Sequence, residues 1–193
     1  MIRKLYDWLM GLAASPNAPW ALAAVSFAES SFFPIPPDIL LIPMVVARRT
    51  LWWLYALLCT LSSVIGAYFG YLIGALLFQA IGQPLLHFYG AEEAFANLKT
   101  WYDQWGAWGI FIGAVTPFPY KVLTIFSGTV GFDLLLFTLV SVVGRGLRFF
   151  IVSGLLFWFG EPIRLFIEKR LGLMLTLFVV LLIGGFVALK YLG

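Results

Sequence analysis

The chain has 193 residues, of which 62% are apolar and only 11% are charged, against roughly 25% charged in soluble domains, so its composition excludes a soluble globular fold. The net charge of +3 is small, and the basic residues lie near expected membrane edges rather than in a run, which excludes nucleic acid as a partner and indicates a membrane protein. One cysteine, Cys59, and one histidine, His87, exclude a disulfide, a metal site and a histidine-based proton relay, so no cofactor is expected.

The first segment, residues 1–15, is amphipathic and contains Arg3, Lys4 and Asp7. It lacks the long apolar core and the small-residue cleavage site of a signal peptide. We therefore expect a helix that lies at the membrane interface.

Residues 18–47 form an apolar stretch that is broken in its middle by Pro34, Pro36 and Pro37. One straight helix of about 30 residues would be roughly 45 Å long, too long for a hydrocarbon layer of ~30 Å. A proline removes a backbone donor and ends a helix, which hydrocarbon tolerates only where the break lines a cavity in the protein. We expect a re-entrant hairpin, which enters and leaves the membrane on one side.

Residues 51–79 are predicted to be the first full crossing. Ser62, Gly66, Gly70 and Gly74 recur every four residues, a pattern that lets another helix approach closely. This helix would belong either to the same chain or to a second copy in a homo-oligomer. Residues 80–105, the most polar part of the chain, are predicted to be a surface loop with a short amphipathic helix.

The second half follows the same plan. Residues 107–131 are broken at Pro117 and Pro119 and are predicted to form a second re-entrant hairpin. Full crossings are expected over 133–158 and 171–190. The expected fold is thus an all-α integral membrane domain with two re-entrant hairpins and about three crossing helices.

The charges of the loops predict the orientation. The segment 80–105 is net acidic and would face one side, while most basic residues outside the crossings would face the other: Arg3, Lys4, Arg48, Arg49, Arg164, Lys169 and Arg170. The positive-inside rule makes the basic side, with the N-terminus, cytoplasmic. The two hairpins then enter from opposite faces, which is the topology of an inverted repeat.

Five ionisable residues fall at membrane depth: Glu29, Asp38, Lys121, Arg145 and Arg148. Each costs at least ~2.5–3.5 kcal/mol on insertion scales, so each needs a partner, water or a function. Asp38 either caps the outgoing half of the first hairpin or takes part in transport. Glu29 either forms a structural ion pair with Arg145 or Arg148, or carries protons.

The three bases suggest an anion site. Lys121 begins the outgoing half of the second hairpin, where a cation is unfavourable unless an anion binds there, or unless its stem reaches the interface. Arg145 and Arg148 are three residues apart and share a helix face. They either balance the two acids or bind a phosphate, which arginine matches with two parallel hydrogen bonds. Backbone carbonyls at the breaks would need water or substrate, so a polar cavity is expected there.

A family resemblance covers about residues 15–160. The stretch Phe27-Ala-Glu29 followed by Pro-Ile-Pro resembles the first signature of the DedA family, also called the VTT or SNARE-associated Golgi group. Thr-Pro-Phe-Pro-Tyr-Lys121 and Gly-Arg-Gly-Leu-Arg148-Phe-Phe resemble its YqaA-like branch. The resemblance implies two facing re-entrant hairpins and places Glu29 and Asp38 at the family's acidic positions.

The second hairpin departs from the family pattern. Typical members carry Gly-Arg-Phe-x-Pro-x-x-Arg, whereas this chain has Ala114 at the first arginine and Lys121 shifted by one from the second. We expect Arg145 and Arg148 to supply the missing guanidinium from the adjoining helix.

The resemblance implies lipid translocation in the bacterial inner membrane, with polyprenyl phosphate or phospholipid as substrate and dependence on the proton gradient. In that interpretation Glu29 and Asp38 carry protons, while Lys121, Arg145 and Arg148 bind the phosphate. A proton-coupled antiporter of small cations or drugs, with the acids as its site, is the alternative. An enzyme is not expected, because His87 in the polar loop is no base for a serine nucleophile, and a pure scaffold would not need five buried charges.

Overall fold

The computed structural model describes residues 15–33 and 35–160, and these ranges contain helices and no strand. The helices are α2 (Ala18–Ser31), α3 (Asp38–Ala47), the 3-10 helix η1 (Arg49–Leu51), α4 (Trp52–Leu77), the π-helix η2 (Phe78–Gly82), α5 (Gln83–Tyr89), α6 (Glu92–Val115), α7 (Tyr120–Val130) and α8 (Leu134–Phe159). The expectations for residues 1–14, Pro34 and 171–190 lie outside the described residues.

Both apolar stretches are interrupted at their prolines. Pro37 occupies the N-cap position of α3, and Pro119 occupies that of α7. α6 ends at Val115 because Thr116 precedes Pro117 and takes an extended conformation, with φ −83° and ψ 168°, as residues before proline prefer. Helices α2 and α6 therefore end shortly before the prolines, at Ser31 and Val115, as the sequence predicts.

The polar segment 80–105 is more helical than the loop that the sequence suggested. Pro84 does not end the helical stretch Arg49–Tyr89. It lies at the start of α5, directly after the π-helix η2, where the backbone hydrogen-bond pattern changes. The real turn is at Gly90, whose φ of +61° closes α5. α6 then begins at Glu92, with Glu93 also in its first turn, where carboxylates suit the helix dipole. The first arm of the second broken pair thus starts 15 residues before the expected 107.

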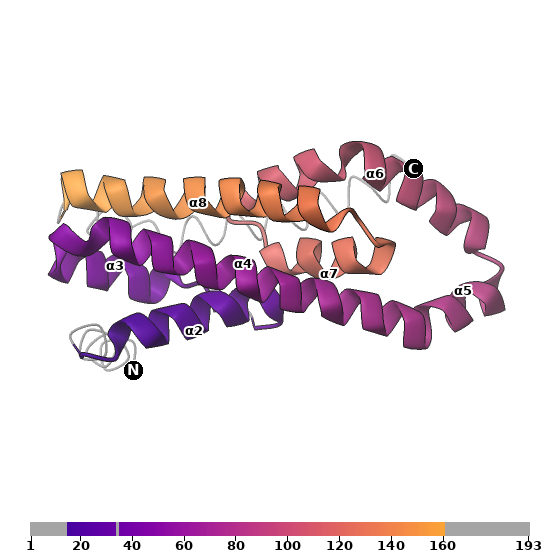
Figure 1. Ribbon diagram of the computed structural model, residues 1–193, viewed down its shortest axis with the longest axis horizontal. Coiled ribbons are helices and arrows are strands. Elements are labelled where there is room, and N and C mark those ends of the chain that lie inside the picture. Colours follow the sequence, from indigo (N-terminus) through magenta and orange to yellow (C-terminus); the bar gives the residue numbers. More distant parts are fainter. Residues whose placement is uncertain (1–14, 34, 161–193) are drawn as a thin grey trace, which may run out of the picture.

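The helices form one elongated bundle (Figure 1). The long helices α4 and α8 run along it in opposite directions. The pair α2 and α3 enters from one end and the pair α6 and α7 from the other, so that the two breaks meet near the middle. A broken pair followed by a long helix therefore occurs twice, in opposite directions.

The glycines of α4 allow this close packing. A side chain at Gly66 would collide with the backbone of Phe27 on α2, and one at Gly74 would collide with the backbone of Ile125 on α7. Gly70 lies against Ser30 and Thr124. The small residues of α4 therefore pack against helices of the same chain. Through them, α2 of the first broken pair and α7 of the second lie close to α4.

Two apolar clusters are separated by a polar layer. The first cluster, between α2, α3, α4 and α8, comprises Ala18, Leu22, Leu40, Leu41, Met44, Val45, Tyr55, Ala56, Cys59, Phe149 and Leu156. The second, toward the α6–α7 end, comprises Ala67, Tyr102, Ile110, Ala114, Tyr120, Val130, Phe132 and Phe137. Along α4 and α8, the buried Ser63 and Arg145 lie between the two clusters.

Within residues 15–33 and 35–160, two helical stretches are long and apolar enough to cross a membrane, Arg49–Tyr89 and Leu134–Phe159. They contain α4 and α8, which correspond to the crossings expected over 51–79 and 133–158. Asp133 begins α8 by accepting a hydrogen bond from the backbone N–H of Leu136 at 2.7 Å, the usual role of an N-cap aspartate.

Candidate functional site

Four of the five charges expected at membrane depth form two ion pairs in the middle of the bundle. Arg145 donates from Nη2 to Oε2 of Glu29. Arg148, one turn later on α8, donates from Nη2 to Oδ2 of Asp38 at 2.7 Å. Both pairs connect the first broken pair of helices to α8. The sequence left open whether Glu29 pairs with Arg145 or with Arg148, and the structure pairs it with Arg145.

Arg145 lies where four helices meet. Its side chain is completely buried, and its guanidinium lies between the rings of Tyr120 and Phe149, 4.9 and 4.7 Å from their centroids. The Nε atom donates to Oγ of Ser63 on α4 at 2.6 Å. Its Nη1 atom has no hydrogen-bond partner among the described residues. A buried cation held by one carboxylate and two aromatic faces is well fixed, yet keeps one free donor edge.

Asp38 does not cap α3. Pro37 holds the N-cap position, and no side-chain capping hydrogen bond is present at this helix start. Asp38 is instead the first helical residue, with Oδ2 on Arg148 and a buried Oδ1 that has no partner in the described part of the chain. The capping interpretation was wrong because Pro37, the last proline of the break, already occupies the N-cap position, and the Asp38 carboxylate faces Arg148 of α8 instead.

Arg148 joins the first break to the second. Besides Asp38, it donates from Nη1 to the backbone carbonyl of Thr116 at 3.0 Å. We expected water or substrate to satisfy such a carbonyl, but here an arginine does. The Arg148 side chain keeps 14% of its exposure and that of Asp38 keeps 23%, so this pair, unlike Arg145, can be reached from outside.

Lys121 is the surplus positive charge. It is half-buried in the first turn of α7 and takes part in none of the ion pairs found in residues 15–33 and 35–160. Its backbone carbonyl accepts from Oγ1 of Thr124 at 2.9 Å, and the same hydroxyl lies 2.9 Å from the carbonyl of Ser30. The two broken pairs of helices therefore contact each other directly through Thr124 of α7 and Ser30 of α2.

Ala114 is the residue at which the sequence resemblance would place an arginine. It is fully buried, and a Cβ on Gly144 would come within 2.6 Å of the Ala114 Cβ. Gly144 directly precedes Arg145. The small pair Ala114 and Gly144 thus lets α8 pack closely on α6 beside its two arginines.

Ser30 and Ser63 belong to the site, although our sequence reasoning missed them. The Ser30 hydroxyl lies 3.2 Å from Glu29 Oε2 and 2.6 Å from the Ser63 hydroxyl. The signal was present, because serines in apolar helices point toward polar neighbours. The sequence alone does not show which of the many serines and threonines face the charges.

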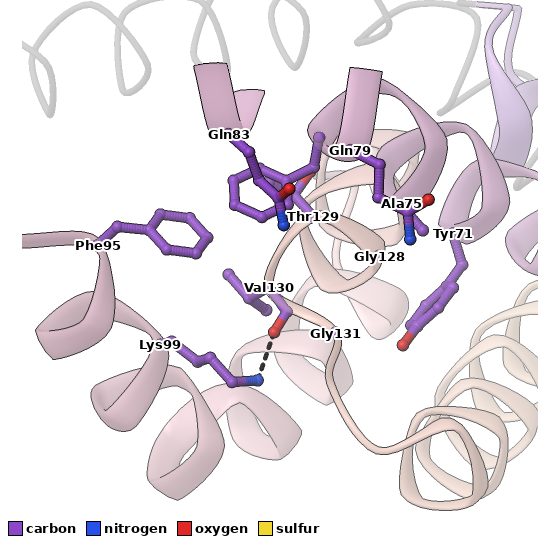
Figure 2. A pocket seen from close by; sticks show the side chains of 11 residues that line it. Tyr71, Ala75, Gln79, Gln83, Phe95, Lys99, Gly128, Thr129, Val130 and Gly131 are labelled. Atoms are coloured by element: carbon purple, nitrogen blue, oxygen red, sulfur yellow. Dashed lines mark hydrogen bonds between the residues drawn. The ribbon is translucent and has the colours of Figure 1, made fainter. Parts of the chain in front are cut away.

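An open groove of about 300 Å³ lies elsewhere, between α4, η2, α6 and α7. Figure 2 shows Gln79, Gln83 and Thr129 around it, and Lys99 donating to the carbonyl of Val130 near the end of α7. None of the five site charges lines this groove, so it is not the polar cavity expected between the breaks. In the described residues, no cluster of histidine, cysteine or carboxylate side chains could hold a metal ion.

The chain is similar to known sequences over most of its length. The family model for the VTT domain matches residues 35–157. An uncharacterised protein of Haemophilus influenzae is 32% identical over 186 residues, which cover 96% of each chain. An uncharacterised protein of Histophilus somni is 32% identical over 157 residues, which cover 81% of this chain and 82% of the relative. No solved structure matches.

Proposed function

The chain belongs to the VTT-domain family of membrane proteins, also called the DedA family, and on this premise we propose that it moves the anionic head group of a lipid across the bacterial inner membrane. The substrate is a polyprenyl phosphate or a phospholipid, and movement depends on the proton gradient. The observation that carries the proposal is the pairing of Glu29 with Arg145 and of Asp38 with Arg148 where the two helix breaks meet, with Lys121 as an additional cation.

The membrane placement follows from helix length. α2, α3 and α7 have 14, 10 and 11 residues, so each is at most about 21 Å long and does not span a ~30 Å hydrocarbon layer. We assign α2–α3 and the inner part of α6 with α7 as re-entrant hairpins, and α4 and α8 as crossings. The opposite directions of the two halves in Figure 1 support an inverted repeat, as in transporters that bind substrate near the midplane.

The orientation rests on the ends of the bundle. Arg48 and Arg49 lie where α3 joins α4, and we place this end in the cytoplasm with the N-terminus. The other end carries His87 and Glu92, which pair at 2.9 Å. A hydrogen bond from its own backbone N–H and another from His87 hold the pKa of the Glu92 carboxyl below its usual value. A stably charged carboxylate suits an end outside the membrane.

The charges of the five site residues give a reason why protons and an anion would move together. With both carboxylates ionised, three bases and two acids leave one surplus positive charge at the site. Each proton taken up by Glu29 or Asp38 adds one more. A phosphate group is therefore held more tightly when the acids are protonated, and losing the protons releases it.

The order of contact follows from burial. Lys121 and Arg148 are partly exposed and meet a head group first, whereas Arg145 is enclosed and is reached only when the breaks separate. The lipid tail stays in the bilayer. The packing of Ala114 on Gly144 supports the idea that α8 supplies the guanidinium groups that typical relatives carry in the second hairpin.

A cation antiporter fits this geometry less well. A cation site uses carboxylate oxygens, but one oxygen of each carboxylate already accepts from an arginine, and the positive charge of that arginine disfavours a second cation beside it. We also propose that the protein is not an enzyme. Its histidine pairs with Glu92 at one end of the bundle, away from the buried serines, so no serine among the described residues has a histidine base.

Reconstitution into liposomes tests the proposal. Head-group movement is measured for a polyprenyl phosphate and for a phospholipid, with and without a pH gradient. Faster movement of either lipid under the gradient supports coupled transport, and gradient-independent movement makes the protein a scramblase. If folded protein moves neither lipid, the function is wrong and the antiporter becomes the better candidate.

A further inference from the structure

Four side chains from three helices form a closed ring of hydrogen bonds around the inner ion pair. Arg145 Nε on α8 donates to Ser63 Oγ on α4 at 2.6 Å. Ser63 Oγ lies 2.6 Å from Ser30 Oγ on α2. Ser30 Oγ in turn donates to Glu29 Oε2 at 3.2 Å, and Arg145 Nη2 closes the ring on the same oxygen.

The chemistry of the end groups fixes the direction of this ring. A guanidinium can only donate hydrogen bonds, and an ionised carboxylate can only accept them. Ser63 therefore accepts from Arg145 and donates to Ser30, and Ser30 donates to Glu29. In this direction every hydroxyl proton has an acceptor, which matters because both serines are completely buried.

When Glu29 is protonated, its carboxyl group is no longer only an acceptor. The donor and acceptor roles of the two serines are then no longer fixed. A neutral carboxyl loses the charge assistance that strengthens both bonds to Oε2. If the new proton points to Ser30, Ser30 must donate to Ser63, which then receives two donors. The Ser63 proton is left without an acceptor in the ring. The ring thus keeps all its hydrogen bonds only while Oε2 carries no proton, and it is strongest while Glu29 is ionised.

We propose that Ser30 and Ser63 are positioning residues that hold Glu29 in its ionised form, and that protonation of Glu29 opens the ring and frees the Nε and Nη2 edges of Arg145 for the anionic head group. Only the last step, the capture of a head group by Arg145, rests on the function proposed above. Arg145 already has an unused donor at Nη1, so an opened ring would offer an anion all three guanidinium nitrogens.

Other titratable groups surround the ring and must be followed in any test. Arg148, Tyr120 and Asp38 act electrostatically on Arg145 together with Glu29. The charges of Asp38, Arg145 and Arg148 also act on the Cys59 thiol of α4. The Tyr120 hydroxyl donates to Ser141 and is not a member of the ring.

The same helix supplies matched controls. Ser26 and Ser31 of α2 are as completely buried as Ser30. Their hydroxyls donate to backbone carbonyls of α4, those of Cys59 and Gly66, at 2.8 and 2.9 Å. Replacing Ser26 by alanine therefore removes a contact of similar kind between α2 and α4 but leaves the ring intact.

The test follows the protonation of Glu29 without using transport. A lipid-soluble carbodiimide, which modifies protonated carboxyl groups, is applied to the whole protein in liposomes over a range of pH. Peptide mapping by mass spectrometry then separates labelling of Glu29 from that of Asp38. In Ser30→Ala and in Ser63→Ala we expect the midpoint of Glu29 labelling to rise by about one pH unit, because a hydrogen bond to the ionised form is lost. Ser26→Ala should keep the native midpoint.

Two results would overturn the inference. One is an unchanged Glu29 midpoint in the two ring variants, and the other is an equal rise in Ser26→Ala, which would indicate general loosening of α2. If Ser63→Ala does not fold, Ser30→Ala decides alone, since it removes the donor to Oε2 directly. A shifted midpoint in a protein that moves no lipid would refute the transport function and keep the ring. Lipid movement by the native protein, with no shift of the Glu29 midpoint in the ring variants, would refute the ring and keep the transport function.

Discussion

Arg145 of α8 forms its ion pair with Glu29 of α2 across 116 positions of the sequence, and this contact joins the two halves of the molecule at their polar centre. The Glu29 side chain keeps 12% of its exposure while Arg145 has none. The carboxylate is therefore the partner that protons can reach, and the guanidinium is the partner that must be uncovered before an anion can bind it.

Breaking this pair from one side should be more harmful than removing it altogether. Arg145→Leu leaves the Glu29 carboxylate without its main partner, and loss of one member of a buried pair typically costs about 3–5 kcal/mol. In the double variant Glu29→Leu/Arg145→Leu no charge remains to be compensated, so we expect a smaller loss. Unfolding in detergent, measured for the native chain, both single variants and the double variant, gives the coupling. Additive losses would contradict the pairing.

The glycines of α4 make a second prediction about packing. Gly66→Ala places a methyl group on the backbone of Phe27, so α2 must move away from α4, and we expect a clear drop in the yield and the unfolding temperature of the folded protein. Gly109→Ala on α6 is the matched control, because a Cβ there meets nothing within 4 Å. The control should be neutral or stabilising by up to about 1 kcal/mol, owing to the better helix propensity of alanine. Equal tolerance of both substitutions would show that α2 is not seated as described.

Lys121 separates a role in transport from a role in stability. It has no ion-pair partner in the described part of the chain and lies at the positive end of the α7 dipole, so Lys121→Ala should leave the unfolding temperature unchanged or slightly higher. Head-group movement should fall about tenfold, the effect of losing roughly 1.4 kcal/mol of anion binding. Unchanged lipid movement in this variant would remove Lys121 from the site. Efflux of a small cation that survives the change would favour the antiporter.

Much of the fold could be predicted because its causes are local. Pro117 follows the end of α6, and Pro37 and Pro119 stand at the N-caps of α3 and α7, so closely spaced prolines mark both interruptions. The apolar runs that became α4 and α8 are long enough to be recognised by length alone. The start of α6 could not be placed from the sequence. Polar residues such as Glu92 and Glu93 indicate a loop by composition, yet they also favour a helix start through the helix dipole.

The site was predictable in its membership but not in its pairing. Charges in an apolar segment are conspicuous, and opposite charges must meet somewhere. Which arginine meets which acid depends on where α2 and α8 lie along the bundle. Gly66 and Gly70 pack α4 closely against α2, and Gly144 packs α8 closely against α6. The ring through Ser30 and Ser63 depends on the same placement of the helices, so no local pattern reveals it.

Head-group movement in liposomes under a pH gradient, compared for the native chain, Arg148→Ala and Lys99→Ala, decides whether the paired charges carry the head group. Arg148 touches both breaks, through Asp38 and Thr116, whereas Lys99 is a cation of the separate groove. We expect Arg148→Ala, folded and inserted, to move head groups at least about ten times more slowly, since a hydrogen bond to a charged group contributes about 1.5–3 kcal/mol. Lys99→Ala should retain the native rate. Native movement by folded Arg148→Ala, or an equal loss in Lys99→Ala, would contradict the claim that the paired charges between the two breaks carry the head group.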